Sequence, residues 1–331
     1  MRTGASGWFN GAVGITIFAG SLPATRVAVT AFDPVLLTAA RATIAGGLAL
    51  VLLALFRQPR PSRADLRSLA VVALGVVVGF PLLTAFALQR VTSAHSVVFI
   101  GLLPLATAAF GVLRGGERPC PAFWLFSGVG SALVAGFALS GGAALSPVGD
   151  GLMLGAIALC GLGYAEGARL SRRLGGWQVI SWALALALPL MLALTIFAWP
   201  TSLGGIHAPA WAALAYVSLF SMLIGFVFWY RGLAQGGIAA VGQLQLLQPF
   251  LGLALAGGLL GEPVSHAMLA VTLGVVGCVA GARRFAGVAV PVPAPRPLDP
   301  LDPRGSVPPR TRRFVNRRRS VLSCISRSAR T

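Results

Sequence analysis

The sequence contains no lysine and little charge of either sign. All 26 basic residues are arginine, only eight residues are Asp or Glu, and charged residues make up 10% of the chain. Average soluble domains contain about 25% charged residues. The chain is 56% hydrophobic, and its mean hydropathy is +0.83. A soluble protein of this composition would lack the polar surface to cover itself, so the composition excludes a water-soluble enzyme and indicates a polytopic membrane protein.

The motifs of metal centres and nucleophilic enzymes are also missing. The four cysteines form no CxxC pair, and the three histidines, His95, His207 and His266, are far apart in the sequence. No apolar stretch contains HExxH, GxSxG or a pair of aspartates. The arginines lie between apolar runs instead of alternating with aromatic residues, as nucleic-acid binding would require. We therefore expect no catalytic residue, no metal, no cofactor and no nucleic-acid partner.

The chain contains ten apolar windows of the length that crosses a bilayer as a helix, about 20 residues. We predict an all-α polytopic membrane protein with ten transmembrane helices. A cleaved signal peptide over the first window would leave nine spans and break the repeat described below. The ten windows are residues 8–28, 34–56, 68–88, 94–113, 121–140, 151–170, 177–199, 211–230, 237–260 and 264–285.

The distribution of arginine predicts how the chain is oriented. Thirteen arginines lie at the amino terminus or in connections that follow even-numbered spans, whereas the other connections hold only Arg26 and Arg90. Cytoplasmic connections are enriched in positive charge, so we expect a multi-pass protein of the cell inner (plasma) membrane with both termini in the cytoplasm. The aromatic residues near the ends of spans fit interfacial belts, Trp199 with Trp211 on one side and Trp229–Tyr230 on the other.

The segment 286–331 differs from the rest of the chain. It is rich in proline and holds ten arginines against two aspartates. Such a segment cannot bury enough apolar surface to fold, so we predict a disordered cytoplasmic tail. Its arginines could contact anionic lipids at about 1 kcal/mol per charge, but we favour an extension without a function.

A weak internal repeat relates the two halves of the chain at an offset of 145 residues. Each half, 8–140 and 150–285, contains five predicted spans. Because five is odd, the second half must be inverted in the membrane relative to the first. Inverted repeats are typical of secondary transporters, in which the substrate site lies near the midplane between them. The matches are Leu88 with Leu233, Ala94 with Ala239, Pro104 with Pro249, Gly116–Glu117 with Gly261–Glu262, and residues 134–136 with 279–281.

The repeat predicts a small-molecule carrier that works by alternating access. The alternatives are a polytopic membrane enzyme and a noncatalytic membrane scaffold or channel subunit. A scaffold would gain nothing from two exchangeable halves, and an enzyme would need the motifs that are missing.

The chain resembles the EamA family of the drug/metabolite transporter superfamily over residues 8–285. The resemblance rests on two five-helix halves, on a Gly-Glu pair after spans 4 and 9, and on Leu246-Leu247-Gln248-Pro249 inside span 9. It implies transport of small metabolites, amino acids or drugs, and of these activities we expect export. It names neither the substrate nor the coupling ion, and it leaves a homodimer open.

Spans 4 and 9 are the first candidates for the lining of a passage. Pro104 and Pro249 each remove a backbone donor and should kink their helices, either beside a cavity or only for packing. On a helix, Gln245 and Gln248 share a face while Gln243 points elsewhere. Amides in hydrocarbon need partners, so Gln245 and Gln248 are predicted to bind substrate, with interhelical hydrogen bonds as the alternative.

Four further residues carry functional hypotheses. Arg41 lies inside span 2, where a charge is costly, so it either binds substrate or extends to the interface. Tyr164 offers a hydroxyl to substrate or belongs to an aromatic belt. His95, near the outer start of span 4, is a candidate for proton coupling or an interfacial residue. Glu166 is a candidate for gating or proton coupling, although a local ion pair with Arg169 is the simpler expectation.

Other residues have structural predictions. Glu117 and Glu262 each precede the next span and suit its amino-terminal end, where the helix dipole favours an anion. Glycines inside spans allow helices to approach closely in lipid. The pairs expected at such contacts are Gly46–Gly47, Gly128 with Gly130, and Gly274 with Gly277.

Overall fold

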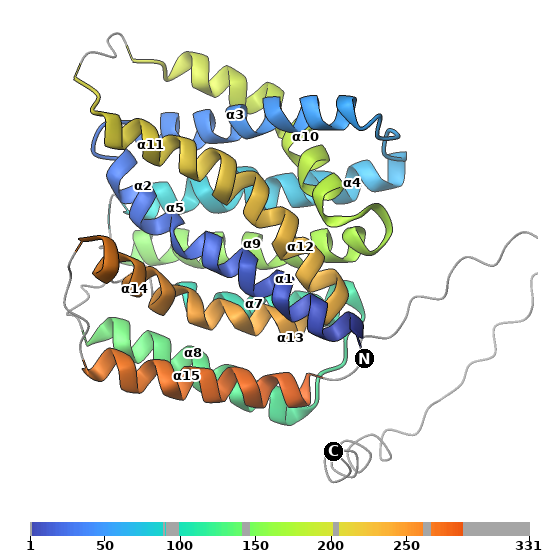
Figure 1. Ribbon diagram of the computed structural model, residues 1–331, viewed down its shortest axis with the longest axis vertical. Coiled ribbons are helices and arrows are strands. Elements are labelled where there is room, and N and C mark those ends of the chain that lie inside the picture. Colours follow the sequence, from blue (N-terminus) through green and yellow to red (C-terminus); the bar gives the residue numbers. More distant parts are fainter. Residues whose placement is uncertain are drawn as a thin grey trace, which may run out of the picture.

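The protein is a bundle of helices in the computed structural model shown in Figure 1. The structure describes residues 2–88, 90, 99–140, 146–200, 205–260 and 266–286. Within these residues it contains helices and no strand, which confirms the all-α expectation. The coupling candidate His95, the helix-end candidate Glu262 and the predicted tail from residue 287 lie outside the described residues.

Helical segments occupy each of the predicted windows. In the first half they are α1 (Arg2–Ala19), α2 (Ser21–Ala28), α3 (Pro34–Leu55), α4 (Arg63–Val72), η1 (Ala73–Gly79), α5 (Phe80–Leu88), α7 (Leu103–Gly115) and α8 (Pro121–Leu139). In the second half they are α9 (Pro147–Leu174), α10 (Gly176–Phe197), α11 (Ala208–Tyr216), η2 (Val217–Ile224), α12 (Gly225–Gly236), α13 (Ile238–Gly242), η3 (Gln243–Leu247), α14 (Gln248–Leu260) and α15 (His266–Phe285).

Side-chain caps begin several of these helices. The Asp33 carboxylate accepts the backbone N–H of Val35 and Leu36, and Pro34 supplies the first residue of α3. Ser62 and Asp65 form a reciprocal capping box at the start of α4. Glycines with positive φ, which favours a residue without Cβ, lie directly after α7, α9 and α12, at Gly116, Gly175 and Gly237.

Several helical runs are long and apolar enough to cross a membrane. In the described residues there are five, at Pro34–Leu55, Arg63–Ala87, Pro147–Leu174, Gly176–Phe197 and Ala208–Gly236, with shorter apolar helices at Leu103–Gly115 and Pro121–Phe137. The chain is therefore a multi-pass membrane protein. A total of ten crossings remains a prediction.

Five of the predicted spans are interrupted in the described residues, which the hydropathy pattern did not indicate. The fourth breaks at a turn over residues 101–102, directly before α7. The first is divided at Gly20 into α1 and α2. The third and the eighth each contain a π-helical segment, η1 and η2, and the ninth contains the 3₁₀ segment η3. Hydropathy reports only the apolar character of a stretch, whereas these changes alter how its backbone groups pair.

The closest helix pairs join the two halves of the sequence. α3 packs against α10, and α8 packs against α15. α1 packs against α12 and also contacts α13, η3 and α14. α9 packs against α4, η1, α5 and α7. In Figure 1, α8 and α15 lie at one side of the bundle and α3 and α10 lie toward the other.

Glycines bring some of these helices into close contact. A Cβ built on Gly232 would lie 2.6 Å from the backbone nitrogen of Gly11, so α1 and α12 touch through their backbones. Half of the predicted contact glycines behave as expected, since Gly46, Gly130 and Gly274 face neighbouring side chains. The prediction was wrong for Gly47, Gly128 and Gly277, which have open space around their Cβ positions within 4 Å.

The aromatic belt is correct on one side only. Trp199 and Trp211 are 52% and 39% exposed, as interfacial residues should be. Trp229 and Tyr230 are fully buried, and the Trp229 ring packs edge-on against Phe18. These two aromatic side chains of α12 therefore belong to the core, because the face of α12 that carries them is turned toward α1 and α9.

Candidate functional site

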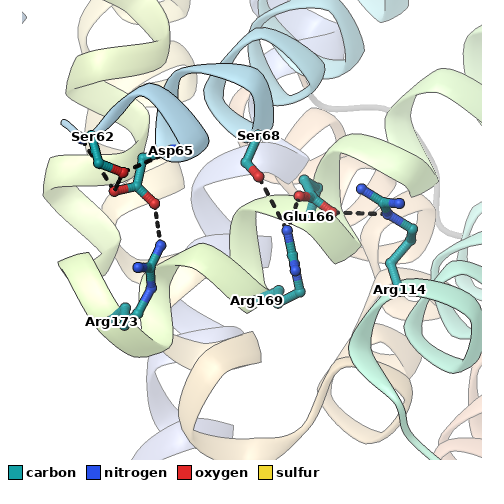
Figure 2. Close-up of polar contacts among 7 residues, drawn as sticks. All are labelled: Ser62, Asp65, Ser68, Arg114, Glu166, Arg169 and Arg173. Atoms are coloured by element: carbon teal, nitrogen blue, oxygen red, sulfur yellow. Dashed lines mark hydrogen bonds and ion pairs between the residues drawn. The ribbon is translucent and has the colours of Figure 1, made fainter. Parts of the chain in front are cut away.

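A cluster of ionic and polar side chains lies where the ends of α4, α7 and α9 meet (Figure 2). Sequence analysis placed these ends on the cytoplasmic side. We call this group the polar cluster. It consists of Asp65, Ser68, Arg114, Glu117, Glu166, Arg169, Arg172 and Arg173.

Glu166 is the buried centre of the cluster. Its side chain is fully buried, and it accepts a hydrogen bond from the Nε of Arg114 on α7 at 3.1 Å. It also pairs with Arg169, one turn further along α9, as the spacing predicted. Arg169 donates to the hydroxyl of Ser68 on α4 at 3.1 Å. One carboxylate from the second half therefore connects to two helices of the first half.

Asp65 forms a second connection between the halves. It is 5% exposed, and its carboxylate pairs with Arg173 near the end of α9. The hydroxyl of Ser62 donates to the same carboxylate at 2.7 Å, so the capping box of α4 also orients the ion pair. Sequence analysis missed this pair because its members are 108 residues apart.

Glu117 forms the third connection. It accepts backbone N–H groups of Ile238 and Ala239, each at 2.7 Å, and the Nη2 of Arg172 at 3.0 Å. The carboxylate therefore lies at the amino-terminal end of α13, where the helix dipole favours an anion. Glu117 was predicted to lie at the amino-terminal end of a helix, and it does. The predicted helix was wrong, because Glu117 caps α13 of span 9 and not the span that follows it in the sequence.

Each of the three connections joins a residue of the first half to a residue of the second. Four arginines share three carboxylates, and the carboxylates are the more deeply buried partners. A pocket of about 430 Å³ opens beside the cluster between α9, α10 and α12, and Arg172 and Arg231 are among the residues that line it. Breaking such bonds would be necessary for the two halves to separate at this end.

The amides of span 9 are buried in the segment η3. Gln245 is 1% exposed, and its Nε2 donates to Gly242 O at 2.9 Å and to the hydroxyl of Thr107 on α7 at 3.3 Å. Its Oε1 has no partner among the described residues, and neither does either amide atom of Gln243. Gln248 is half-buried at the start of α14. A 3₁₀ turn has three residues, so Gln245 and Gln248 project toward one side.

Pro104 and Pro249 occupy equivalent places. Pro104 is the second residue of α7, and Pro249 is the second residue of α14. Each follows an i→i−3 backbone hydrogen bond, from Leu102 to Phe99 and from Gln248 to Gln245. The prolines therefore begin new helices in spans 4 and 9 instead of bending continuous ones, which agrees with their missing N–H. Both are buried.

Arg41 lies on α3 and faces η2. Its Nη2 donates to the Ser221 hydroxyl at 3.2 Å, and that hydroxyl accepts a 2.8 Å hydrogen bond from Ser21. Its Nε is buried without a partner among the described residues. Tyr164 lies elsewhere, on α9, where its ring packs edge-on against Phe226 and Trp229. No hydrogen bond or ring contact between described residues joins Arg41 or Tyr164 to the amides of η3, so the predicted substrate residues fall into separate groups.

Comparison with known proteins identifies the family. The model of the EamA-like transporter family matches residues 5–139 and again residues 147–282. The "Uncharacterized transporter YdeK" of Bacillus subtilis is 68% identical over 286 residues, which cover 86% of this chain and 100% of that protein. A "Probable terminal-alkyne amino-acid exporter" of Streptantibioticus cattleyicolor is 26% identical, over 82% of this chain and 92% of its own length.

A solved crystal structure has the same fold. It superposes with a TM-score of 0.72 at 22% sequence identity and covers 85% of this chain and 98% of its own. The fold, the apolar helices and the two family matches agree with one another. The chain is a membrane transporter that belongs to the EamA-like transporter family.

Proposed function

We propose that the protein exports small polar metabolites across the plasma membrane by alternating access between two inverted five-helix halves, with both termini in the cytoplasm. The substrate path would lie between α7 and the segments α13, η3 and α14. Gln245 and Gln248 would contact the substrate, and Pro104 and Pro249 would divide the two lining helices. Export is the direction named for the amino-acid exporter that is 26% identical to this chain.

The observation that carries this proposal is a backbone feature repeated at the sequence offset. In η1 the N–H of Phe80 donates to Gly75 O, and in η2 the N–H of Gly225 donates to Phe220 O. Both are i→i−5 bonds, and both members of the second pair lie 145 residues after those of the first. π-helical turns are rare, so two at equivalent positions support a common architecture of the halves.

The packing pattern also supports a two-fold relation. Exchanging each helix of the first half with its counterpart in the second preserves the closest helix pairings. The contact of α1 with α12 in one arrangement corresponds to the contact of α9 with η1 and α5 in the other. The contacts of α3 with α10 and of α8 with α15 each correspond to themselves. With five spans in each half, this exchange requires an axis in the membrane plane.

In this proposal the polar cluster closes the cytoplasmic end. All four ion pairs that the structure describes lie at this end, and three of them join the halves. A hydrogen bond to a charged group is worth about 1.5–3 kcal/mol, and less in this cluster because the arginines are partly exposed to solvent. Glu166 would therefore act as a gating residue through Arg114 and Arg169.

Cysteine labelling along spans 4 and 9 tests alternating access. Ala106 and Leu251 are related by the 145-residue offset, as are Leu102 and Leu247, and all four are half-buried. In a background without native cysteines, a cysteine at each position is expected to react with an impermeant maleimide from either side of the membrane. Leu125→Cys is a control that should react from neither side, because Leu125 is 66% exposed on the apolar surface of α8.

Labelling from one side only would contradict alternating access through these helices. Tags at the amino terminus and at Asp150 provide an independent test of inversion, because the proposal places them on opposite sides of the membrane. If both tags report the same side, the halves are not inverted. If the folded wild-type protein carries no flux in proteoliposomes, the scaffold alternative is favoured.

Substitution of the amides tests the substrate path. Gln245→Leu and Gln248→Leu should each reduce transport about tenfold or more while membrane expression stays normal, because each removes an amide donor and acceptor from the proposed path. Thr107→Val is the control, since it removes only the Thr107 partner of Gln245. If Thr107→Val reduces transport as much as Gln245→Leu, the amide holds α7 and does not bind substrate. Unchanged transport in both glutamine variants would assign them to packing.

A further inference from the structure

The interior of the bundle contains a cation, Arg41, for which the described residues supply no counter-charge. Among the described carboxylates, Asp65, Glu117 and Glu166 bind arginines of the polar cluster. Asp33 caps α3 and lies eight residues before Arg41, about 12 Å along the helix. Asp150 lies in the first turn of α9, which has no close packing with α3.

Arg41 has partial contacts with hydroxyls instead. Within the described residues, its one side-chain hydrogen bond joins Nη2 to Ser221, a residue that is 4% exposed. The adjacent Nε donor is buried and has no partner in the described part of the chain. The residue as a whole is half-buried, while its Nε lies among the buried atoms. A charge inside a membrane protein that lacks a counter-ion is costly.

We propose that Arg41 is the counter-ion for a carboxylate on the transported molecule, so that this transporter selects substrates that carry one carboxylate. The inference rests on the proposed transport function, names its substrate class, and extends the proposed substrate path beyond α7 and η3 to the face of α3 that meets η2. The free Nε and the neighbouring Nη2 lie on one edge of the planar guanidinium, which matches the two oxygens of a carboxylate. The Ser221 hydroxyl beside this edge provides a further donor.

One carboxylate fits this site better than a phosphate ester does. Arg41 carries one positive charge, and the other described arginines lie at helix ends or in connections. A dianionic phosphate would keep an uncompensated charge inside the membrane, whereas a monocarboxylate forms a neutral pair with Arg41. The pairing also explains how Arg41 is tolerated in α3, because the bound cargo supplies the missing charge.

The test compares matched ligands with purified full-length protein. Tryptophan fluorescence and thermal shift are measured with a panel of uncharged-chain monocarboxylates, their carboxamides and the phosphate esters of the matching alcohols. We expect carboxylates to bind at least about tenfold more tightly than the matched carboxamides in the wild type. Arg41→Gln should abolish this preference, Arg41→Lys should keep a weakened preference, and Arg67→Gln, an exposed arginine on α4, should leave it unchanged.

Several results would overturn the inference. These are equal binding of carboxylates and carboxamides, preference for the phosphate esters, no binding by any carboxylate of the panel, or full preference in a folded Arg41→Gln variant. Flux in proteoliposomes separates this inference from the proposed function. If carboxylates bind in a way that depends on Arg41 but the protein carries no flux, the proposed transport function is wrong and the carboxylate site stands. If the protein carries flux but its preference for carboxylates does not depend on Arg41, the transport function stands and the carboxylate site at Arg41 is wrong.

Discussion

Replacing Glu166 by glutamine is expected to open the cytoplasmic end of the bundle and to reduce net transport at least tenfold. Glu166 is fully buried and joins α9 to Arg114 on α7. The neutral amide cannot hold two guanidinium groups. Because both arginines are about half exposed, they can move into water, so we expect the fold to survive while the closed state loses about 1–3 kcal/mol. A shift of that size changes the ratio of two states by about 5–150-fold.

The measurement is the reaction of a single cysteine at Ala106 with a maleimide added from the cytoplasmic side. Ala106 contacts Gly161 across the interface between α7 and α9, about two turns deeper than Arg114. Its labelling should become faster in Glu166→Gln and in Arg114→Gln. The double variant should be no faster than Glu166→Gln alone, because that variant has already lost the bond to Arg114. Additive effects, or no change in labelling, would show that the ion pair does not hold this end closed.

Replacing Gly232 by alanine is expected to destabilise the whole bundle. The new methyl group would lie 2.6 Å from Gly11 N, 2.8 Å from Gly11 Cα and 3.0 Å from Gly7 O. All three atoms belong to the backbone of α1, so no side chain can move aside. Overpacking of this kind costs about 1–3 kcal/mol, and the two helices must separate to relieve it. We expect the thermal unfolding temperature in detergent to fall by several degrees, with less protein inserted in the membrane.

Gly47→Ala is the matched control for this substitution. Gly47 also lies inside a long helix, but a Cβ there would meet nothing within 4 Å. Alanine favours a helix by about 1 kcal/mol over glycine, so Gly47→Ala should leave the unfolding temperature unchanged or raise it. Equal destabilisation by the two substitutions would mean that the contact between α1 and α12 does not limit stability.

Hydropathy predicted the helices of this protein well because the membrane requires long apolar segments whatever their partners are. It could not predict which face of a helix turns inward. Gly46 and Gly47 are adjacent and equally suited to close packing, yet only Gly46 contacts α10. Trp229 and Tyr230 resemble an interfacial belt in sequence, but the rotation of α12 buries both.

The candidate site was predicted where its chemistry is local. The pairing of Glu166 with Arg169 follows from their spacing on one helix. Arg114 lies 52 residues from Glu166, and Glu117 lies 121 residues from Ile238, so only the fold brings them together. The available signal was Glu117 itself, an acidic residue between Arg114 and Arg118 in a connection. It indicated an ionic role for the carboxylate but did not indicate its partner.

The two π-helical turns have a mechanical consequence. Each turn accommodates one residue more than an α-helix would, and such a surplus residue can migrate along a helix as successive hydrogen bonds exchange partners. Its passage rotates the intervening side chains by about 100° around the helix axis without unwinding it. η1 packs against α9, and η2 contacts α1 and α3. Such a shift in η1 or η2 would turn the side chains of that segment relative to α9, or to α1 and α3, while the helix itself stays continuous.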